Sequence, residues 1–437
     1  MRLERRASRD QPRLEGSPPT PSVPGVRVVL DARPLQDPDR APTTAAYLEG
    51  LLSAFDSNPI PGESFAFLLQ ADLDDPTARF GRLEVVGRRL LPPTRLLRSG
   101  ALTVDPFLVR GASLGAAWRA EEGGAAGAVY HAAGGSVPIP VLSKVPTVVT
   151  LLDLAPWELP AAFQRGAAAR FGQRLRAGLM REAAAVLVAG DEVARSARRL
   201  LRLRASRLHV IPLAAREAFR APRRPDEGRA ERDRLGLPER YLVYAGRFDA
   251  RHDLSTLLQA LANLAAAGRP AMLPSDVPWP PRILIVGASP DDRAAVARAA
   301  AHAGVGDALA YSPRVDLERV AALVAGARAA LLPVTSEAAG LPAIEALAAG
   351  TPVIASAVGV LPKIVAAAGI LVEPGNAGRL AQALATTWAD DRVHERLAVE
   401  ARERSFRERR TWEDVARETR AVYAGVGLWR PGGSAPV

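Results

Sequence analysis

The strongest constraint on the fold is an alternation of short apolar runs and helical segments that passes through the chain twice. The first series of expected strands is Val26–Leu30, Phe65–Leu69, Ala128–His131, Thr147–Leu151, Ala185–Ala189 and Leu208–Ile211. The second is Tyr241–Ala245, Ile283–Val286, Ala329–Leu332, Val353–Ala355 and Ile370–Val372. Apolar strands separated by helices are typical of parallel sheets that are covered on both faces. The sequence therefore predicts an α/β protein with two Rossmann-like domains that face a cleft.

This pattern divides the 437 residues into five expected segments, because a chain of this length exceeds one ordinary core. Residues 1–25 are rich in Arg, Pro and Ser and predict a disordered tail. A first domain is expected over residues 26–215, a Pro- and charge-rich linker over 216–239, and a second domain over 240–410. Residues 411–437 are expected to form a C-terminal helix and a tail.

Composition argues against several classes of protein. The chain has no cysteine, which removes disulfides and thiol catalysis and fits a reducing cytoplasm. No apolar run reaches the roughly 18 residues of a membrane span, and no apolar stretch of a secretory signal follows the basic start. The net charge of +10 is carried almost wholly by arginines spread among acids, without a recognition motif. Nucleic acid is therefore not an expected partner.

The segment that begins at Ala329 has the features of an anion-binding turn. An apolar strand is followed by a loop in which Gly340 and Pro342 suit the start of a helix. The N-terminus of a helix presents free N–H groups and a positive dipole end to a negative group. The amides of Ala339, Gly340 and Leu341 are therefore expected to hold the diphosphate of a nucleotide.

Two glutamates, Glu337 and Glu345, lie eight residues apart around this turn. Glu345, one turn into the helix, could accept two hydroxyls of a ribose. Glu337, in the loop, could accept sugar hydroxyls or stabilise positive charge at an anomeric carbon. Taken singly, Glu337 also fits a solvated loop residue, and Glu345 an ordinary first-turn glutamate favoured by the helix dipole.

Taken together, Ser336–Ser356, with its two glutamates, Gly-Leu-Pro and Ala-Gly-Thr-Pro, resembles the Glu-x₇-Glu segment of retaining glycosyltransferases of family 4 (group 1). The resemblance implies the GT-B fold, with a donor-binding second domain, an acceptor-binding first domain and a C-terminal helix that packs back on the first. It implies transfer from a UDP- or GDP-linked sugar to a glycan, lipid-linked or small-molecule acceptor, as in polysaccharide biosynthesis. Retention is ascribed in this family to same-face attack assisted by the leaving phosphate, without a metal ion.

A second stretch, Tyr241–Leu254, resembles the family's strand followed by Gly-Arg and Lys-Asn, whose two cations clamp the donor diphosphate. Arg247 matches the first cation and is expected to act in catalysis with Glu337. His252 stands at the position of the lysine, and Arg251 could reach the phosphates bidentately instead. Alternatively, Arg247 is a surface ion-pair partner and His252 a residue at a helix N-terminus.

The first domain departs from the family at several places. Its first loop has no glycine, Leu152 stands where relatives have a histidine, and Leu213–Ala214 replace Asn-Gly. His131 and Asp153 are candidates for the acceptor side, although a buried histidine fits His131 equally well. These departures keep open a rival interpretation, in which a weak or inactive relative binds a sugar nucleotide or serves as a scaffold subunit.

Two further patterns concern metals and membranes. Asp37–Asp39 and Asp72–Asp74 fit a metal-binding Asp-x-Asp motif, but such pairs are common in loops and no other ligand cluster supports them, so no metal is expected. A basic, partly amphipathic helix over residues 165–181 favours peripheral contact with the inner face of the cell membrane. The expected location is otherwise the cytoplasm.

Overall fold

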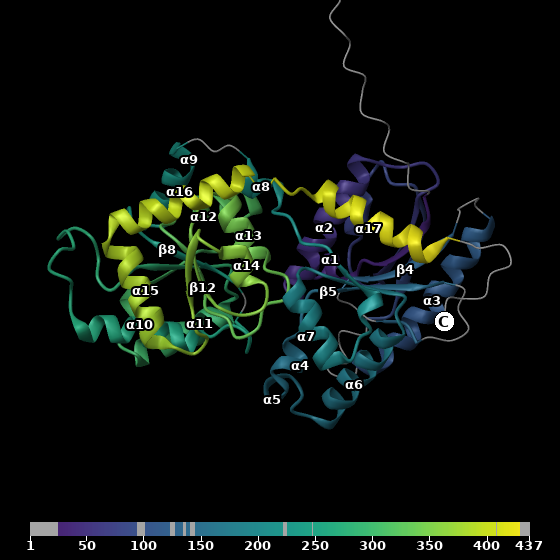
Figure 1. Cartoon of the computed structure of the whole chain (residues 1–437), viewed down its shortest axis with the longest axis horizontal. Helices are drawn as coiled ribbons and strands as arrows, with labels where there is room; N and C mark the ends of the chain where they lie inside the picture. Colours follow the sequence, from purple (N-terminus) through teal and green to yellow (C-terminus); the bar gives the residue numbers. More distant parts are fainter. Residues whose placement is uncertain are drawn as a thin grey trace, which may run out of the picture.

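The computed structural model describes residues 25–93, 101–122, 127–133, 137–139, 145–221, 225–246, 248–407 and 409–428. Two α/β units lie side by side, and the chain passes between them twice (Figure 1). Among the described residues, none of the helices has both the length and the apolar character needed to cross a bilayer.

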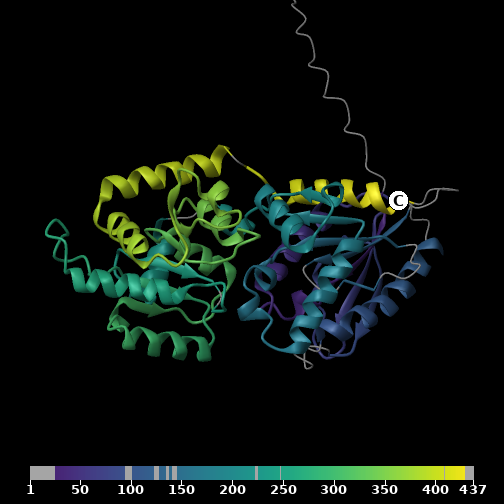
Figure 2. The ribbon, with the colours of Figure 1, turned by 60° about the horizontal axis from the view of Figure 1, so that its bottom comes forward.

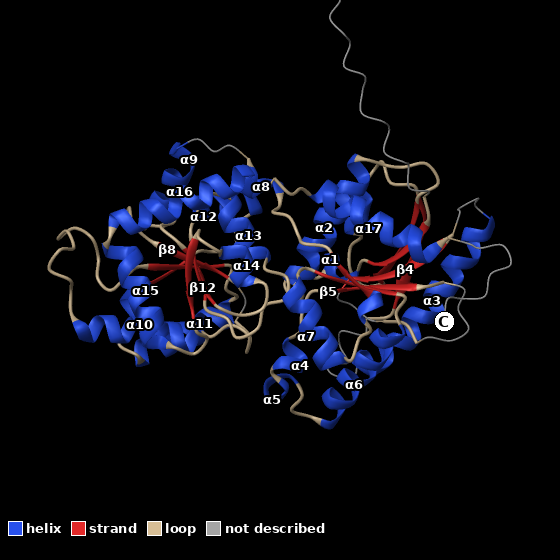
Figure 3. Ribbon diagram, viewed as in Figure 1, coloured by secondary structure: helices blue, strands red, loops and turns tan. Residues whose placement is uncertain are grey.

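The first unit contains a seven-stranded sheet of order β3-β2-β1-β4-β5-β6-β7, in which every neighbouring pair is parallel. Its strands are β1 Arg27–Asp31, β2 Ser64–Gln70, β3 Val85–Leu91, β4 Ala128–Ala133, β5 Thr147–Leu151, β6 Ala185–Val188 and β7 Leu208–Val210. Helices cover both faces of this sheet (Figure 3).

The second unit contains a six-stranded parallel sheet of order β10-β9-β8-β11-β12-β13. Its strands are β8 Leu242–Ala245, β9 Ile283–Val286, β10 Leu309–Tyr311, β11 Ala330–Leu332, β12 Val353–Ser356 and β13 Gly369–Val372. In both sheets the strand order reverses beside the first strand, as in Rossmann-type folds. The predicted fold class, with two Rossmann-like domains, is confirmed.

The helices that connect and cover the strands vary from single turns to 22 residues. Their bounds are α1 Arg33–Gln36, α2 Pro42–Ser57, α3 Ala101–Glu122, α4 Ala155–Glu158, α5 Pro160–Phe163, α6 Ala167–Glu182, α7 Asp191–Leu201, α8 Glu217–Arg220, α9 Pro225–Arg234, α10 Leu254–Ala267, α11 Pro290–His302, α12 Leu317–Ala325, α13 Leu341–Ala348, α14 Leu361–Val365, α15 Ala377–Ala389, α16 Asp391–Arg407 and α17 Trp412–Gly427.

Two strands, β3 and β10, were not predicted from the sequence, and both lie at a sheet edge. An edge strand is covered less completely, so it lacks the continuous apolar run that marks a central parallel strand. Strand β3 contains Gly87 and the exposed Arg88 and Arg89, and β10 has only three residues.

Helix α17 returns from the second unit and packs on α2 of the first, as Figures 1 and 2 show. Thr411 and Asp414 form a reciprocal capping box that fixes the start of this helix. Trp412 packs so closely over Gly50 that a Cβ there would lie 2.2 Å from the indole ring. The C-terminal helix therefore completes the core of the first unit.

His131, the acceptor-side candidate, is buried next to that core. Its Nε2 lies 2.7 Å from Thr150 Oγ1, and its Nδ1 lies 2.7 Å from the Tyr423 hydroxyl of α17. The ring is fully enclosed, and burial lowers the pKa of His131 to about 3. The alternative of a buried, hydrogen-bonded histidine is therefore the one that the structure shows.

This depressed pKa predicts that the protein loses stability in mild acid. Below about pH 6.5 the unfolded chain binds a proton at His131 that the folded chain excludes, so stability falls as pH drops from 6.5 towards 3. At pH 5 the loss is about 2 kcal/mol. In His131→Gln, which keeps a donor and an acceptor but does not titrate, the decline from pH 7 to pH 5 should be smaller by about that amount.

Urea denaturation at the two pH values measures this difference. His302→Gln, at an exposed position on α11, is the matched control and should leave the decline unchanged. Equal declines in the wild type and His131→Gln would contradict the assignment.

Candidate active site

Four of the described donor candidates lie near the switch point of the second sheet, between β8 and β11: Arg251, His252, Leu341 and Glu345. The loop after β8 and the loop after β11 are joined by backbone hydrogen bonds. The Thr335 N–H donates to the Arg251 carbonyl at 2.7 Å, and the Asp253 N–H donates to the Pro333 carbonyl at 2.7 Å. Ligands of doubly wound sheets bind at this crevice, outside the carboxyl ends of the strands.

A cavity of about 750 Å³, here called the cleft cavity, opens at this point. The second unit contributes the two loops and the start of α13, and the first contributes the segment around the start of α2 and the loop after β5. Its size falls within the usual range for small-molecule sites. Its lining includes Arg251, His252, Glu337, Leu341, Glu345 and Asp153.

Glu337 occupies the turn that leads into α13. Its Oε1 accepts hydrogen bonds from the Ala339 N–H at 2.9 Å and the Gly340 N–H at 2.8 Å. Two of the amides expected to hold a diphosphate are thus satisfied by this carboxylate, and a diphosphate must replace it to reach them. The backbone of Gly359 packs directly against this turn, and only glycine fits there, because a Cβ would lie 1.7 Å from the Glu337 carbonyl oxygen.

Glu345 is paired with an arginine that was not predicted from the sequence. Arg216, in the segment after β7, donates from Nε to Oε1 at 2.5 Å and from Nη2 to Oε2 at 2.9 Å. Burial lowers the pKa of Arg216, but the charge of Glu345 and its hydrogen bonds outweigh burial, so that the pKa of Arg216 is raised. A ribose at Glu345 would share this carboxylate with Arg216.

Arg251 is held by two aspartates of different units. It donates to Asp249 Oδ2 at 2.6 Å from Nη2, and its Nη1 lies 3.2 Å from Asp153 Oδ2 across the cleft. Burial lowers the pKa of Arg251, yet Asp249, Asp153 and Glu337 together raise it. The guanidinium that could clamp phosphates is therefore compensated by carboxylates in this structure.

His252 shares Asp249 with Arg251. Its Nδ1 lies 3.0 Å from Asp249 Oδ1, and its backbone pairs with Val334 of the neighbouring loop. Burial raises the pKa of Asp249, but hydrogen bonds from His252 and Arg251 outweigh burial and hold that pKa well below its usual range. His252 thus faces the cleft beside a firmly ionised carboxylate.

The remaining predicted residues are placed differently. Ala339 lines a second cavity rather than the cleft cavity, and Gly340 adopts a positive φ of 70° as the residue before α13. Arg247 lies outside the described residues. Among the residues that are described, no group of three or more His, Asp or Glu side chains is arranged to hold a metal ion.

The sequence did not predict several partners of the cleft residues. Arg216 lies 129 positions from Glu345. Glu158, which contacts the lining residue Ser336, accepts a 2.5 Å hydrogen bond from its Oγ over 178 positions. No local pattern connects such distant residues. Asp249, in contrast, lies two and three positions from Arg251 and His252, so its spacing could have suggested the cluster.

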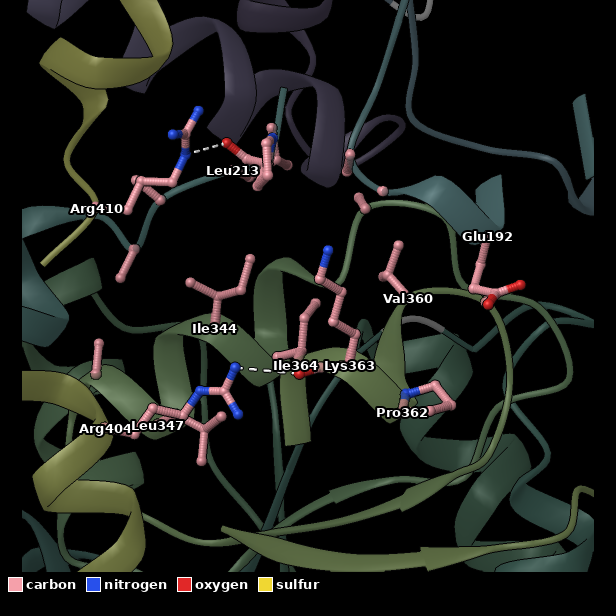
Figure 4. Close-up of a pocket in the computed structure, with 18 of the residues that line it drawn as sticks. Glu192, Leu213, Ile344, Leu347, Val360, Pro362, Lys363, Ile364, Arg404 and Arg410 are labelled. Atoms are coloured by element: carbon pink, nitrogen blue, oxygen red, sulfur yellow. Dashed lines mark hydrogen bonds between the residues drawn. The ribbon is translucent and has the colours of Figure 1, made fainter. Parts of the chain in front are cut away.

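The second cavity, of about 700 Å³, lies on the other side of α13 (Figure 4). Ile344 and Leu347 face this cavity, whereas Leu341 and Glu345 face the cleft cavity. Arg410, in the upper part of Figure 4, also lines this cavity, and its Nε donates to the Pro212 carbonyl at 2.5 Å. Helix α13 is therefore a common wall between the two cavities.

Comparison with known proteins relates this geometry to a family. Residues 229–404 match the family model of glycosyl transferases group 1. No protein of curated function matches the sequence.

Solved structures resemble the chain over nearly its whole length. Sucrose-phosphate synthase from Thermosynechococcus elongatus is 21% identical, with a TM-score of 0.67 over 92% of this chain and 98% of that one. Anabaena HepE in complex with UDP and glucose is 16% identical, with a TM-score of 0.65 over 91% and 99%. WaaG, a glycosyltransferase involved in lipopolysaccharide biosynthesis, is 18% identical, with a TM-score of 0.64 over 91% and 99%. The chain therefore has the two-domain GT-B fold of these proteins, and its second domain matches the glycosyl transferases group 1 family.

Proposed function

We propose that the protein is a retaining glycosyltransferase of family 4 that transfers a hexose from a nucleotide-diphosphate sugar without a metal ion. The observation that carries the proposal is the position of Glu337 and Glu345 in one cavity, at the switch point of the donor-side sheet. The match of residues 229–404 supports the same reaction class.

In this proposal the donor lies across the second domain. Glu345 accepts the ribose hydroxyls beside Arg216, and Glu337 accepts sugar hydroxyls and stabilises positive charge at the anomeric carbon. Arg251 and His252 hold the diphosphate, together with the N-terminus of α13. Arg247 is included on its place in the sequence alone.

Retention then follows from attack on the face from which the diphosphate leaves. The leaving phosphate oxygen takes the proton of the attacking hydroxyl, so the protein need supply no nucleophile. Asp153, on the first-domain side of the cavity, is the candidate for contact with the acceptor. The proposed acceptors are glycans, lipid-linked molecules or small molecules. Helix α6, with the exposed Arg170, Phe171 and Arg174, is the proposed contact with a membrane surface inside the cell.

UDP is the first candidate for the nucleotide, because HepE was solved with UDP and glucose. The rival function, a sugar-nucleotide-binding or scaffold subunit with little activity, is favoured by Leu152 and by the ion pairs that occupy Glu345 and Arg251. Both functions predict nucleotide binding, and only the first predicts turnover.

Calorimetric titration with UDP and GDP, with and without Mg²⁺, is the test. We expect one of the two to bind equally well in both conditions, and Glu345→Ala to weaken it at least about tenfold through loss of two charge-assisted hydrogen bonds. Binding that requires Mg²⁺ would overturn metal independence. Absence of binding by both nucleotides would overturn the donor site.

A further inference from the structure

The cleft cavity has the wrong charge for the ligand proposed above. Its described lining contains seven carboxylates and three arginines, a formal excess of four negative charges. Each of these arginines is already paired with a carboxylate: Arg216 with Glu345, Arg251 with Asp249 and Asp153, and Arg314 with Asp39. A diphosphate entering this cavity therefore needs further positive charge.

His252 is the group that can supply it, because histidine is the side chain that gains charge between about pH 8 and pH 5. Asp249 is ionised, as its depressed pKa indicates, and an ionised carboxylate only accepts hydrogen bonds. The 3.0 Å contact with Asp249 therefore requires that Nδ1 of His252 carries the proton. In the neutral ring, Nε2 is then left with a lone pair.

Nε2 has no hydrogen-bond partner among the described residues, and the side chain lines the cavity while only 12% exposed. Phosphate oxygens of an ionised diphosphate are also acceptors only. A lone pair facing an acceptor is repulsive, so a direct contact between Nε2 and the diphosphate requires a proton on Nε2. Protonation would turn this contact into a charge-assisted hydrogen bond.

Resting on the proposed function, we propose that donor binding is coupled to proton uptake at His252, which thereby supplies the missing cation only when a diphosphate is present. The titratable and charged groups around His252 are mostly acidic. Asp249 and Arg251 lie on its own loop, and Tyr244 of β8 packs edge-on against its ring. Asp153 of the loop after β5, Asp292 of α11 and Glu337 of the loop after β11 line the same cavity.

A sugar nucleotide is the right probe, because its phosphates are diesters, whereas the terminal phosphate of UDP titrates near pH 6 itself. UDP-glucose and GDP-mannose are titrated at pH 7.5 in phosphate and in Tris buffers, whose ionisation heats differ. The difference in heat gives the number of protons bound with the ligand. We expect the wild type to take up close to one proton, and its affinity to fall by up to about tenfold per pH unit over the histidine range.

His252→Lys replaces the titrating group with a fixed cation. This variant should take up no proton, should bind the donor with the same affinity from about pH 6 to pH 8, and should bind more tightly than the wild type at pH 8. His302→Gln, remote on α11, should keep the wild-type proton uptake. Persistent uptake in His252→Lys, or wild-type binding without uptake, would overturn the inference alone. Failure of both sugar nucleotides to bind at pH 6 would instead overturn the proposed function, and this inference with it.

Discussion

Replacement of Glu337 by alanine is expected to lower turnover by about 100- to 1,000-fold while nucleotide binding is retained. Loss of one group placed to stabilise transition-state charge typically costs that much. Nucleotide binding should persist because the variant frees the Ala339 and Gly340 N–H groups, which donate to Glu337 in this structure. The measurements are release of nucleoside diphosphate from a sugar nucleotide and calorimetric affinity for the nucleotide.

A second variant separates charge from loop structure. Glu337→Gln keeps an oxygen that can accept from the two amides but carries no charge. If Glu337 acts in catalysis, turnover falls in Glu337→Gln as well. If the glutamine variant kept wild-type turnover, the charge of Glu337 would have no role in catalysis, and the residue would serve only to shape the loop. Turnover absent from the wild type and both variants, with nucleotide bound by all three, would favour the scaffold function. Glu413→Ala, at an exposed position of α17, is the control.

Replacement of Arg420 by methionine is expected to destabilise the protein by about 3–5 kcal/mol, because it leaves Glu63 buried without its partner. The two side chains are 10% and 3% exposed and are joined by hydrogen bonds of 2.9 and 2.6 Å. Arg420 also donates to the Asn58 carbonyl at 2.8 Å and lies over the Phe55 ring. The free energy of unfolding in urea measures the loss.

The pH dependence of this loss provides an independent check. Burial raises the pKa of Glu63, and Arg420 works against that rise. Without Arg420 the carboxyl takes up a proton more readily in the folded state than in the unfolded one, so the destabilisation should be smaller at pH 5 than at pH 8. Arg417→Met, on the exposed face of the same helix, should change stability by less than about 0.5 kcal/mol. If Arg420→Met changed the free energy of unfolding by an equally small amount, the buried ion pair would not stabilise the packing of α17.

The central strands of the two sheets could be predicted from the sequence, because both of their faces are covered and their residues are therefore mostly apolar. Strand β1, for example, is wholly buried, and its apolar residues mark it without further information. Strand β3 offers no such mark, because it lies at the sheet edge and carries the exposed, charged Arg88 and Arg89. Its pairing with β2 depends on the rest of the sheet.

The candidate site divides in the same way. Glu337 and Glu345 were found because their spacing across one turn is a local property of the chain. Their partners differ in this respect. The Ala339 and Gly340 amides, which donate to Glu337, are neighbours in the sequence. Arg216, the partner of Glu345, comes from a distant segment that only the tertiary fold brings near. For His131 the sequence left a buried position and an acceptor contact equally open, because it does not reveal which face of the sheet α17 will cover.

The return of α17 also determines when the first domain can be finished during synthesis. Tyr423, Val415 and Trp412 fill the same core as α2 and β1, yet they are translated after the whole second domain. At ordinary elongation rates of about 5–20 residues per second, α2 waits roughly 20 to 70 seconds for the helix that covers it. The second domain, whose strands and covering helices are contiguous in sequence, can close before the first. The nascent first domain therefore leaves the apolar residues that α17 will cover without their partner for most of translation.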